Sequence, residues 1–146
     1  MTKIVINKRI GGFGLSYFGL TEYAKRKDLT LYFYDLDSKR KLTKIKNKET
    51  IRSNYDILSC YTYNFGDVID DTYYTPQDQN KYYFSSYFIS RTDPALIEII
   101  EEFGSDKISS TYSLLKIVEI PDDVEWIIEE SEEGIEWISE KHRIWG

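Results

Sequence analysis

KIVINKRIGGFGLSYFGLTEYAKRK, residues 3–27, is the stretch that decides the fold. It opens on an apolar run from Ile4 to Ile6, which is typical of a β-strand. The glycine-rich turn at 11–14 follows, and apolar residues then recur at helical spacing over 17–24. Ser16 stands where a helix N-cap belongs, because its hydroxyl can accept a free backbone N–H of the first turn. The stretch therefore predicts a strand, a tight loop and a helix.

The loop between that strand and that helix is the candidate binding site. Glycine reaches positive φ at little cost, and its bare backbone lets a ligand approach closely. The start of a helix also offers unpaired N–H groups and partial positive charge, which suit a phosphate or a carboxylate. The predicted ligand-binding residues are Lys8, Arg9, Gly11, Gly12, Phe13, Gly14 and Ser16, together with Arg143.

Two alternatives to this site stay open. The spacing of the glycines matches neither the dinucleotide-binding fingerprint nor a P-loop, so the loop could be a plain connection between strand and helix. The guanidinium of Arg143 suits bidentate binding of a phosphate, but a salt bridge to Glu140 is an equal alternative.

Length and composition bound the class of protein. At 146 residues the chain is large enough for its own core, and residues 1–146 are read as a single domain. No apolar run reaches the about 18 residues of a membrane span, and the first residues lack a signal-peptide pattern. We therefore expect no membrane partner and a cytoplasmic location. One cysteine, Cys60, and one histidine cannot build a Cys/His metal cluster, so no metal and no cofactor are predicted, although a carboxylate-only site stays open.

Charge is distributed unevenly along the chain. Residues 1–52 carry 13 of the 19 lysines and arginines and 5 of the 25 acids, a net charge of +8, whereas residues 53–146 carry −14. A chain with net charge −6 is a poor candidate for general nucleic-acid binding. A local basic face that takes one small anionic ligand remains allowed. The alternative is two solvated faces that attract each other, within one chain or between chains.

Further elements follow from the same patterns. The run at 29–34 predicts a second strand, which closes a right-handed parallel β-α-β unit with the first. The basic stretch at 36–50 is read as an exposed loop, either a solvated insertion or a flap over an anionic ligand. We expect strands at 56–63, 81–89, 114–120 and 124–128, the last two as an antiparallel pair, and helices at 94–103 and 135–142. The predicted fold class is α/β: one domain with a mixed, twisted sheet and about three helices.

Aromatic residues are concentrated between residues 55 and 88. Tyrosine stacks on nucleobases, and it also serves half-buried sheets and subunit interfaces. This aromatic load exceeds what one small core should need, and the two halves of the chain carry opposite charge. We therefore expect a homo-oligomer, most simply a dimer.

Catalysis finds little support in the sequence. A nucleophilic triad would have to use His142, whose alternative is a structural hydrogen bond beside Trp137 or Trp145. The pairs at 70–71 and 122–123 are aspartates in predicted turns, where Asp stabilises the turn itself. No catalytic residue is predicted.

Motifs at both ends of the chain carry a resemblance to known proteins. KIVIN at 3–7 leads into GGFGLS at 11–16. The C-terminal part holds RTDPAL at 91–96, LKIVEIPDDVEW at 115–126, GIEWI at 134–138 and EKHRIWG at 140–146. These stretches resemble a family of small, largely uncharacterised proteins carried by phages and mobile elements, and the middle of the chain matches nothing. The family pattern has Asp-Gly where this chain has Glu133-Gly134, and Thr where it has Ile144.

The resemblance implies a mobile-element origin and supplies no catalytic residues. Several phage proteins of this size bind nucleotide immune signals and withhold them from host effectors, which is an analogy of class and size only. The expected function is non-catalytic binding of a small anionic nucleotide-derived ligand, in a phage counter-defence protein that sequesters a host immune signal. The alternatives are a phage inhibitor that binds a host protein through its acidic surface, and an enzyme acting on a nucleotide. A Gly12→Asp change is expected to abolish binding and to leave the fold intact.

Overall fold

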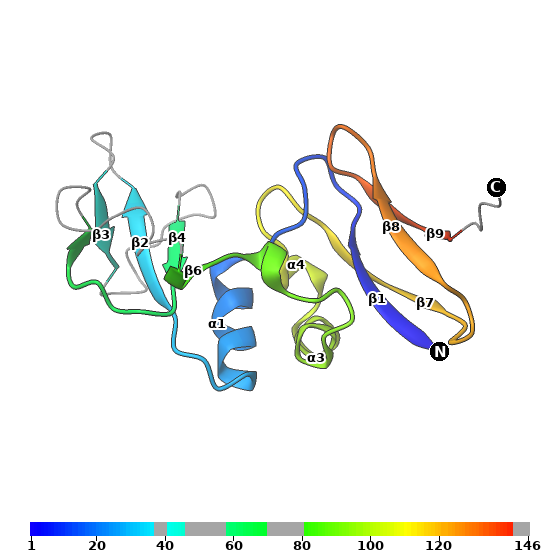
Figure 1. The fold of residues 1–146 in the computed structure, drawn as a ribbon, viewed down its shortest axis with the longest axis horizontal. Coiled ribbons are helices and arrows are strands. Elements are labelled where there is room, and N and C mark those ends of the chain that lie inside the picture. Colours follow the sequence, from blue (N-terminus) through cyan, green and yellow to red (C-terminus); the bar gives the residue numbers. More distant parts are fainter. Residues whose placement is uncertain (37–40, 46–57, 70–80, 142–146) are drawn as a thin grey trace.

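A computed structural model describes residues 1–36, 41–45, 58–69 and 81–141. Its elements in chain order are β1 (Thr2–Asn7), α1 (Tyr17–Arg26), β2 (Tyr32–Leu36), β3 (Leu42–Lys44), β4 (Leu58–Tyr61), β5 (Val68–Ile69), β6 (Tyr83–Phe84), the 3₁₀ turn η2 (Ser86–Phe88), α3 (Pro94–Phe103), α4 (Ser105–Ile108), β7 (Leu115–Ile120), β8 (Trp126–Glu130) and β9 (Glu136–Glu140). Figure 1 shows the helices in the middle of the molecule, with β2 to β6 on one side and β1, β7, β8 and β9 on the other.

The strands form three separate antiparallel sheets. β1 pairs with β7, β8 pairs with β9, and a five-stranded sheet has the order β5-β3-β2-β4-β6. The predicted α/β class is confirmed: the described residues hold the helices α1, α3 and α4, and the N-terminal strand, glycine loop and helix follow in the predicted order. The sheet is not a single mixed one, because every strand pair among the described residues is antiparallel.

The predicted parallel β-α-β unit is wrong, because β1 and β2 belong to different sheets. β1 pairs along its whole length with β7. On its other edge, the N–H of Val5 donates to the carbonyl of Arg91 (2.8 Å) and the N–H of Asn7 donates to the Glu136 carboxylate (2.7 Å). Since both edges of β1 are occupied, β2 pairs instead with β3 and β4.

Helices α1 and α3 begin at the residues that local capping rules select. The hydroxyl of Ser16 accepts the N–H of Gly19 (3.0 Å), and the carboxylate of Asp93 accepts an N–H of the first turn of α3 (2.9 Å). α3 ends at Gly104, whose φ of +89° is a conformation that favours glycine. These three predictions are confirmed.

Two hydrophobic clusters lie on either side of α1. The larger one joins β1, β7 and the helices through Val5, Phe13, Leu15, Tyr23, Ile89, Ala95, Leu96, Ile99, Ile100, Ile108 and Leu115. The smaller one belongs to the five-stranded sheet and consists of Tyr34, Leu42, Tyr61, Phe65 and Ile69. Between them, Tyr17 of α1 packs edge-on against Phe33 of β2, with ring centroids 4.7 Å apart. This aromatic pair connects the helices to the five-stranded sheet.

The helix predicted at residues 135–142 is wrong. Residues 136–140 form strand β9, in which the neighbours Glu136 and Trp137 lie on opposite faces, one buried and one exposed. A tight turn precedes the strand, in which the N–H of Ser131 donates to the carbonyl of Ile135 (2.8 Å). The apolar spacing fits a helix equally well, but the turn brings β9 into register with β8. His142 lies outside the described residues.

Other expected elements are confirmed in part. β7 is the strand predicted at 114–120, whereas β8 pairs with β9 rather than with β7. The strand predicted at 56–63 contains β4, and the run at 81–89 holds β6 and η2 in place of one strand. Within the loop predicted at 36–50, β3 forms a short strand, while 37–40 and 46–50 lie outside the described residues.

Candidate functional site

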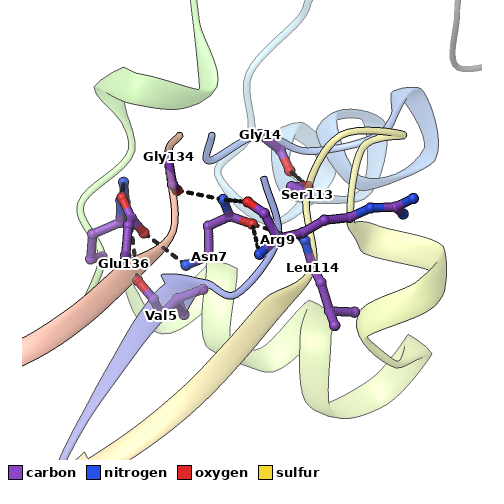
Figure 2. A network of polar contacts seen from close by, with 9 residues as sticks. Val5, Asn7, Arg9, Gly14, Ser113, Leu114, Gly134 and Glu136 are labelled. Atoms are coloured by element: carbon purple, nitrogen blue, oxygen red, sulfur yellow. Dashed lines mark hydrogen bonds and ion pairs between the residues drawn. The ribbon is translucent and has the colours of Figure 1, made fainter. Parts of the chain in front are cut away.

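Asn7 organises the start of the glycine loop. Its side chain is fully buried, and its amide NH₂ donates to the carbonyls of Arg9 (2.7 Å) and Gly134 (2.8 Å). Its amide oxygen accepts the N–H groups of Arg9 (3.2 Å) and Leu114 (2.9 Å). Figure 2 shows these contacts converging on Asn7 from three segments of the chain. One buried side chain thereby fixes the loop to β7 and to the β8–β9 turn.

A buried ion pair lies beside this residue. The guanidinium of Arg91 donates to both carboxylate oxygens of Glu136 (2.7 and 2.8 Å) and to the carbonyl of Val5 (3.1 Å). It also lies over the ring of Phe13, 3.6 Å from the centroid. The same carboxylate accepts the N–H of Asn7 (2.7 Å). The buried carboxylate of Glu136 is thus bound by both Arg91 and Asn7, so the cluster joins β9 to β1 and to the segment before α3.

The glycine loop packs against the protein instead of forming an open cradle. Gly11 and Gly12 have φ of +127° and +98°. The N–H of Gly11 donates to the carbonyl of Glu133 (2.8 Å), and a Cβ on Gly134 would stand 2.6 Å from the Gly12 nitrogen. The close approach of the β8–β9 turn to the loop therefore requires glycine at position 134, whereas a Cβ on Gly11 would stand 2.6 Å from Tyr112.

Much of the remaining loop backbone is also hydrogen-bonded within the protein. The carbonyl of Gly14 accepts the hydroxyl of Ser113 (2.7 Å), as Figure 2 shows. The N–H of Leu15 donates to Ser86 Oγ (3.2 Å), and the N–H of Ser16 donates to the carbonyl of Ile108 (2.8 Å). A phosphate on the predicted Gly11–Ser16 donors would have to displace several of these bonds.

Of the charged candidates, Lys8 and Arg9 lie on the exposed surface just before the loop, and Figure 2 shows the guanidinium of Arg9 directed away from Asn7. Phe13 is buried under Arg91. Arg143 lies outside the described residues, so its place relative to the loop stays a prediction.

The loop geometry also changes the effect that we expect from a substitution at Gly12. A side chain at φ +98° is strained, and a Cβ there would lie 3.0 Å from the hydroxyl of Tyr87. Gly12→Asp is therefore expected to destabilise the fold, which corrects the expectation of an intact variant.

A cavity of about 210 Å³ opens next to the loop, at the start of α1; we call it the serine cavity. Its polar lining consists of Ser16, Ser85, Ser86 and Ser110. Its apolar lining consists of Leu15, Tyr17, Leu20, Phe33, Cys60, Tyr83 and Phe84. Of the predicted site residues within the described part of the chain, Ser16 alone lines it.

A second cavity, of about 300 Å³, lies on the other side of the Tyr17–Phe33 pair, and both rings line both cavities. We call it the lysine cavity, because Lys25 and Lys44 line it. The rest of its lining comes from Thr21, Ala24, Leu29, Thr30, Leu31, Tyr32 and Ile45. Lys44 Nζ donates to Asn64 Oδ1 (3.1 Å) and lies 5.2 Å from the centroid of the Tyr32 ring.

The chemistry of the serine cavity is that of hydroxyls, aromatic rings and one protonated thiol. Burial raises the pKa of the Cys60 thiol to about 12, so it is a poor nucleophile at neutral pH. Within the described residues, no group of three His, Cys, Asp or Glu side chains could hold a metal ion. The hydroxyls of Ser16 and Ser110 already donate to the carbonyl of Lys107 (2.6 Å) and to Ser113 Oγ (2.9 Å). Ser85 and Ser86 accept backbone N–H groups, so their hydroxyls are the ones that can donate to a ring in the cavity.

Sequence reasoning missed most of the cavity-lining residues. Ser85, Ser86 and Ser110 lie far from the glycine loop along the chain, and no motif marks them. The available signal was the doubled serine at 85–86 and at 109–110, each beside an aromatic or apolar run. In the sequence, Lys44 is only one of several lysines in a basic stretch.

Comparisons with protein-family models, with curated proteins and with solved structures found no match. None of the helices in the described part of the chain is long and apolar enough to cross a membrane. The two cavities and the side chains that line them are therefore the basis on which a function can be inferred.

Proposed function

We propose that the chain binds a small anionic, nucleotide-like ligand in the serine cavity and releases it unchanged. The observation that carries the proposal is the composition of this cavity, where four serine hydroxyls and several aromatic rings gather at the start of α1. Small-molecule sites are typically concave and mostly apolar, with a few polar groups that fix the orientation of the ligand.

Each kind of group that lines the cavity can bind one part of a nucleotide. Aromatic rings such as Tyr83 stack on bases, which contributes about 1–3 kcal/mol per base. The hydroxyls of Ser85 and Ser86, which accept backbone N–H groups within the protein, can donate to base edges and sugar hydroxyls. The first turn of α1 adds partial positive charge, which favours a nearby anion. The proposed site keeps the predicted helix start and replaces the glycine backbone by serine hydroxyls.

The size of the cavity limits what can enter it. Its volume of about 210 Å³ is below the roughly 300–1,000 Å³ of pockets that hold drug-sized ligands. It therefore suits a single base or ring, and the remainder of the ligand would lie outside it. The resemblance to phage and mobile-element proteins leads us to propose that the ligand is a nucleotide immune signal of the host, which the protein sequesters.

The test is calorimetric titration of cyclic and ADP-ribose-type nucleotides into the wild type and two tyrosine variants. Tyr83→Leu removes a ring from the serine cavity, whereas Tyr63→Leu removes a ring of similar exposure that lines neither cavity. We expect the Tyr83→Leu variant to bind about 5- to 150-fold more weakly, from the loss of one stacked base, and the control to bind as the wild type. Equal binding by both variants, or a ligand recovered cleaved, would rule out this site and mode of action.

A second candidate function is inhibition of a host protein through the acidic hairpin β8–β9. Ile127 and Trp137 are 40% and 41% exposed on its outer face, where Trp137 Nε1 donates to Glu129 (2.8 Å). Further exposed acids of this region are Glu125, Glu130, Glu132, Glu133 and Glu140. An exposed tryptophan within a negative surface fits a basic partner that normally binds DNA. Release of DNA from such a host protein by the wild type, and not by Trp137→Ser, would support this function; equal release would exclude the hairpin.

We also propose a homo-oligomer, on the basis of exposed aromatic side chains beside the serine cavity. Tyr87 and Phe88 of η2 are 67% and 65% exposed, next to the lining residues Ser85 and Ser86. Burial of such rings is a common driving force for association. Sedimentation at micromolar concentration should show a species larger than the 17.3 kDa chain. A single 17.3 kDa species would contradict the proposal.

A further inference from the structure

We infer that the lysine cavity is the anion subsite of the ligand whose ring enters the serine cavity. This inference rests on the proposed function, and it assigns the negative charge to Lys25 and Lys44 instead of to the glycine loop. The serine cavity accommodates one ring, and none of its described lining residues is a lysine or an arginine. The lysine cavity adjoins it and supplies two ammonium groups.

Lys44 is positioned for this role before any ligand arrives. Its ammonium group donates to Asn64 Oδ1 (3.1 Å) and lies 5.2 Å from the centroid of the Tyr32 ring. An ammonium group has three donors, so one contact with Asn64 leaves donors for a phosphate oxygen. The neighbouring ring and amide restrict the lysine side chain, so less conformational entropy is lost when an anion binds.

Lys25 stands on α1 and carries an acidic neighbour. Its ammonium group contacts Glu22 Oε1 at 3.1 Å. Together, Lys25, Lys44 and Glu22 have a net positive charge, which favours a phosphate monoester carrying about −1.5 to −2 charges. Thr21 and Thr30 add hydroxyls to the same cavity. Glu22 weakens the attraction, so its carboxylate should limit affinity for the phosphate.

The two cavities share part of their lining. Tyr17 and Phe33 line both of them, so the cavities adjoin across this aromatic pair, and a ligand that occupies both has to pass over the outer edge of the pair. Ser16, the N-cap of α1, and Lys25 in its last turn are about 13 Å apart along the helix axis at about 1.5 Å per residue. This span is close to the full length of a ring, a pentose and a phosphate joined in a row. The ligand class is therefore a nucleoside 5′-phosphate or a molecule of the same plan.

The experiment compares the four common nucleosides with their 5′-monophosphates by calorimetry. For at least one pair, the wild type should bind the monophosphate at least about tenfold more tightly than the nucleoside, since each charge-assisted contact contributes to the phosphate alone. In the double variant Lys25→Gln/Lys44→Gln this ratio should fall to near one, with the nucleoside affinity unchanged. Lys116→Gln, an exposed lysine of β7 outside both cavities, should preserve the wild-type ratio.

Two further variants separate the subsite from a general defect in folding. Glu22→Gln removes the repelling carboxylate, so it should strengthen binding of the monophosphate and leave the nucleoside unchanged. Tyr83→Leu should weaken both ligands alike and keep their ratio. A wild type that binds nucleoside and monophosphate equally, or a double lysine variant that loses both alike, would overturn the subsite while leaving the serine cavity in place. If the wild type binds neither member of any pair, both the subsite and this form of the proposed function are wrong.

Discussion

Arg91 and Glu136 form a bidentate ion pair inside the protein, although they are 45 positions apart along the chain. The side chains of Arg91 and Glu136 are only 17% and 4% exposed. Through this pair the segment before α3 is joined to β9, and both are joined to the edge of β1. The pair therefore occupies the edge of β1 along which a parallel strand would have had to pair.

Removing one partner of this pair should destabilise the protein strongly. Glu136→Gln leaves a mostly buried guanidinium without its counter-charge, which costs about 3 kcal/mol or more. Glu101→Gln is the matched control, because Glu101 also pairs with a cation, Lys3, but at the surface. The control should stay within about 1 kcal/mol of the wild type in urea unfolding. Equal unfolding midpoints for the two variants would show that the buried pair contributes no more to stability than the surface pair.

The contact between the β8–β9 turn and the glycine loop should tolerate no side chain. Gly134→Ala combines a strained φ of +93° with a Cβ 2.6 Å from the Gly12 nitrogen, so it should cost at least about 2 kcal/mol. Gly66→Ala has the same kind of strain, at φ +90°, with nothing within 4 Å, and should cost about 1 kcal/mol. The difference between the two in urea unfolding measures the packing contact. No difference would mean that loop and turn separate freely.

Stability should fall in acid partly because of Asp93. Burial alone raises the pKa of this carboxyl, but hydrogen bonds from Tyr23 and the Ala95 N–H, with Lys27 nearby, outweigh it and hold the pKa below its usual value. Because the folded pKa is the lower one, the carboxylate stabilises the fold above pH about 4, the unfolded pKa. This contribution is lost as the pH falls through the folded pKa.

Urea unfolding between pH 7 and pH 2 checks this contribution. Asp93→Asn keeps a capping side chain and should flatten part of the acid dependence. Asp122, whose pKa is lowered by hydrogen bonds from Thr2 and the N-terminus, titrates in the same direction and accounts for some of the remainder. An unchanged pH profile in Asp93→Asn would contradict the assignment.

Cys60 should react slowly in the folded protein. With the pKa of its thiol raised to about 12 by burial, the thiolate fraction at pH 8 is roughly a thousandfold below that of an exposed cysteine of pKa about 8.5. Iodoacetamide labelling followed by mass spectrometry should therefore be slow in buffer and fast in urea. A nucleotide in the serine cavity should slow it further, since Cys60 lines that cavity. Labelling at the rate of an exposed thiol would contradict this picture.

Local features of the fold could be predicted from the sequence, and long-range ones could not. Ser16 and Asp93 cap helices through contacts with residues two or three positions away, so their role is visible in the sequence. From the sequence, Glu136 is expected to be an exposed acid on a helix. Its partner Arg91 comes from a distant segment, so the local sequence does not indicate the ion pair. A pairing of this kind decides between strand and helix only once the chain has folded.

The candidate site likewise has one part that the local sequence predicts and another that depends on long-range contacts. The helix start at Ser16 was predicted from the glycine loop and the N-cap, and it does adjoin a cavity. The serines and aromatic rings that complete the cavity come from β2, β6, the start of η2 and the segment after α4, and their meeting depends on sheet order. The glycines themselves have a structural use that the sequence did not reveal, because it depends on the approach of Gly134.

The most direct test of the central claim is a titration of the ¹⁵N-labelled protein with nucleoside 5′-monophosphates, followed through its amide NMR spectrum. We predict saturable shifts at Ser16, Tyr17, Ser86 and Ser110, small changes at Gly11 and Gly12, and a ³¹P spectrum showing the nucleotide intact. Shifts confined to the glycine loop would show that the ligand binds at the loop and not in the serine cavity. A spectrum unchanged by every nucleotide at millimolar concentration would contradict the proposal that this cavity binds a nucleotide-like ligand.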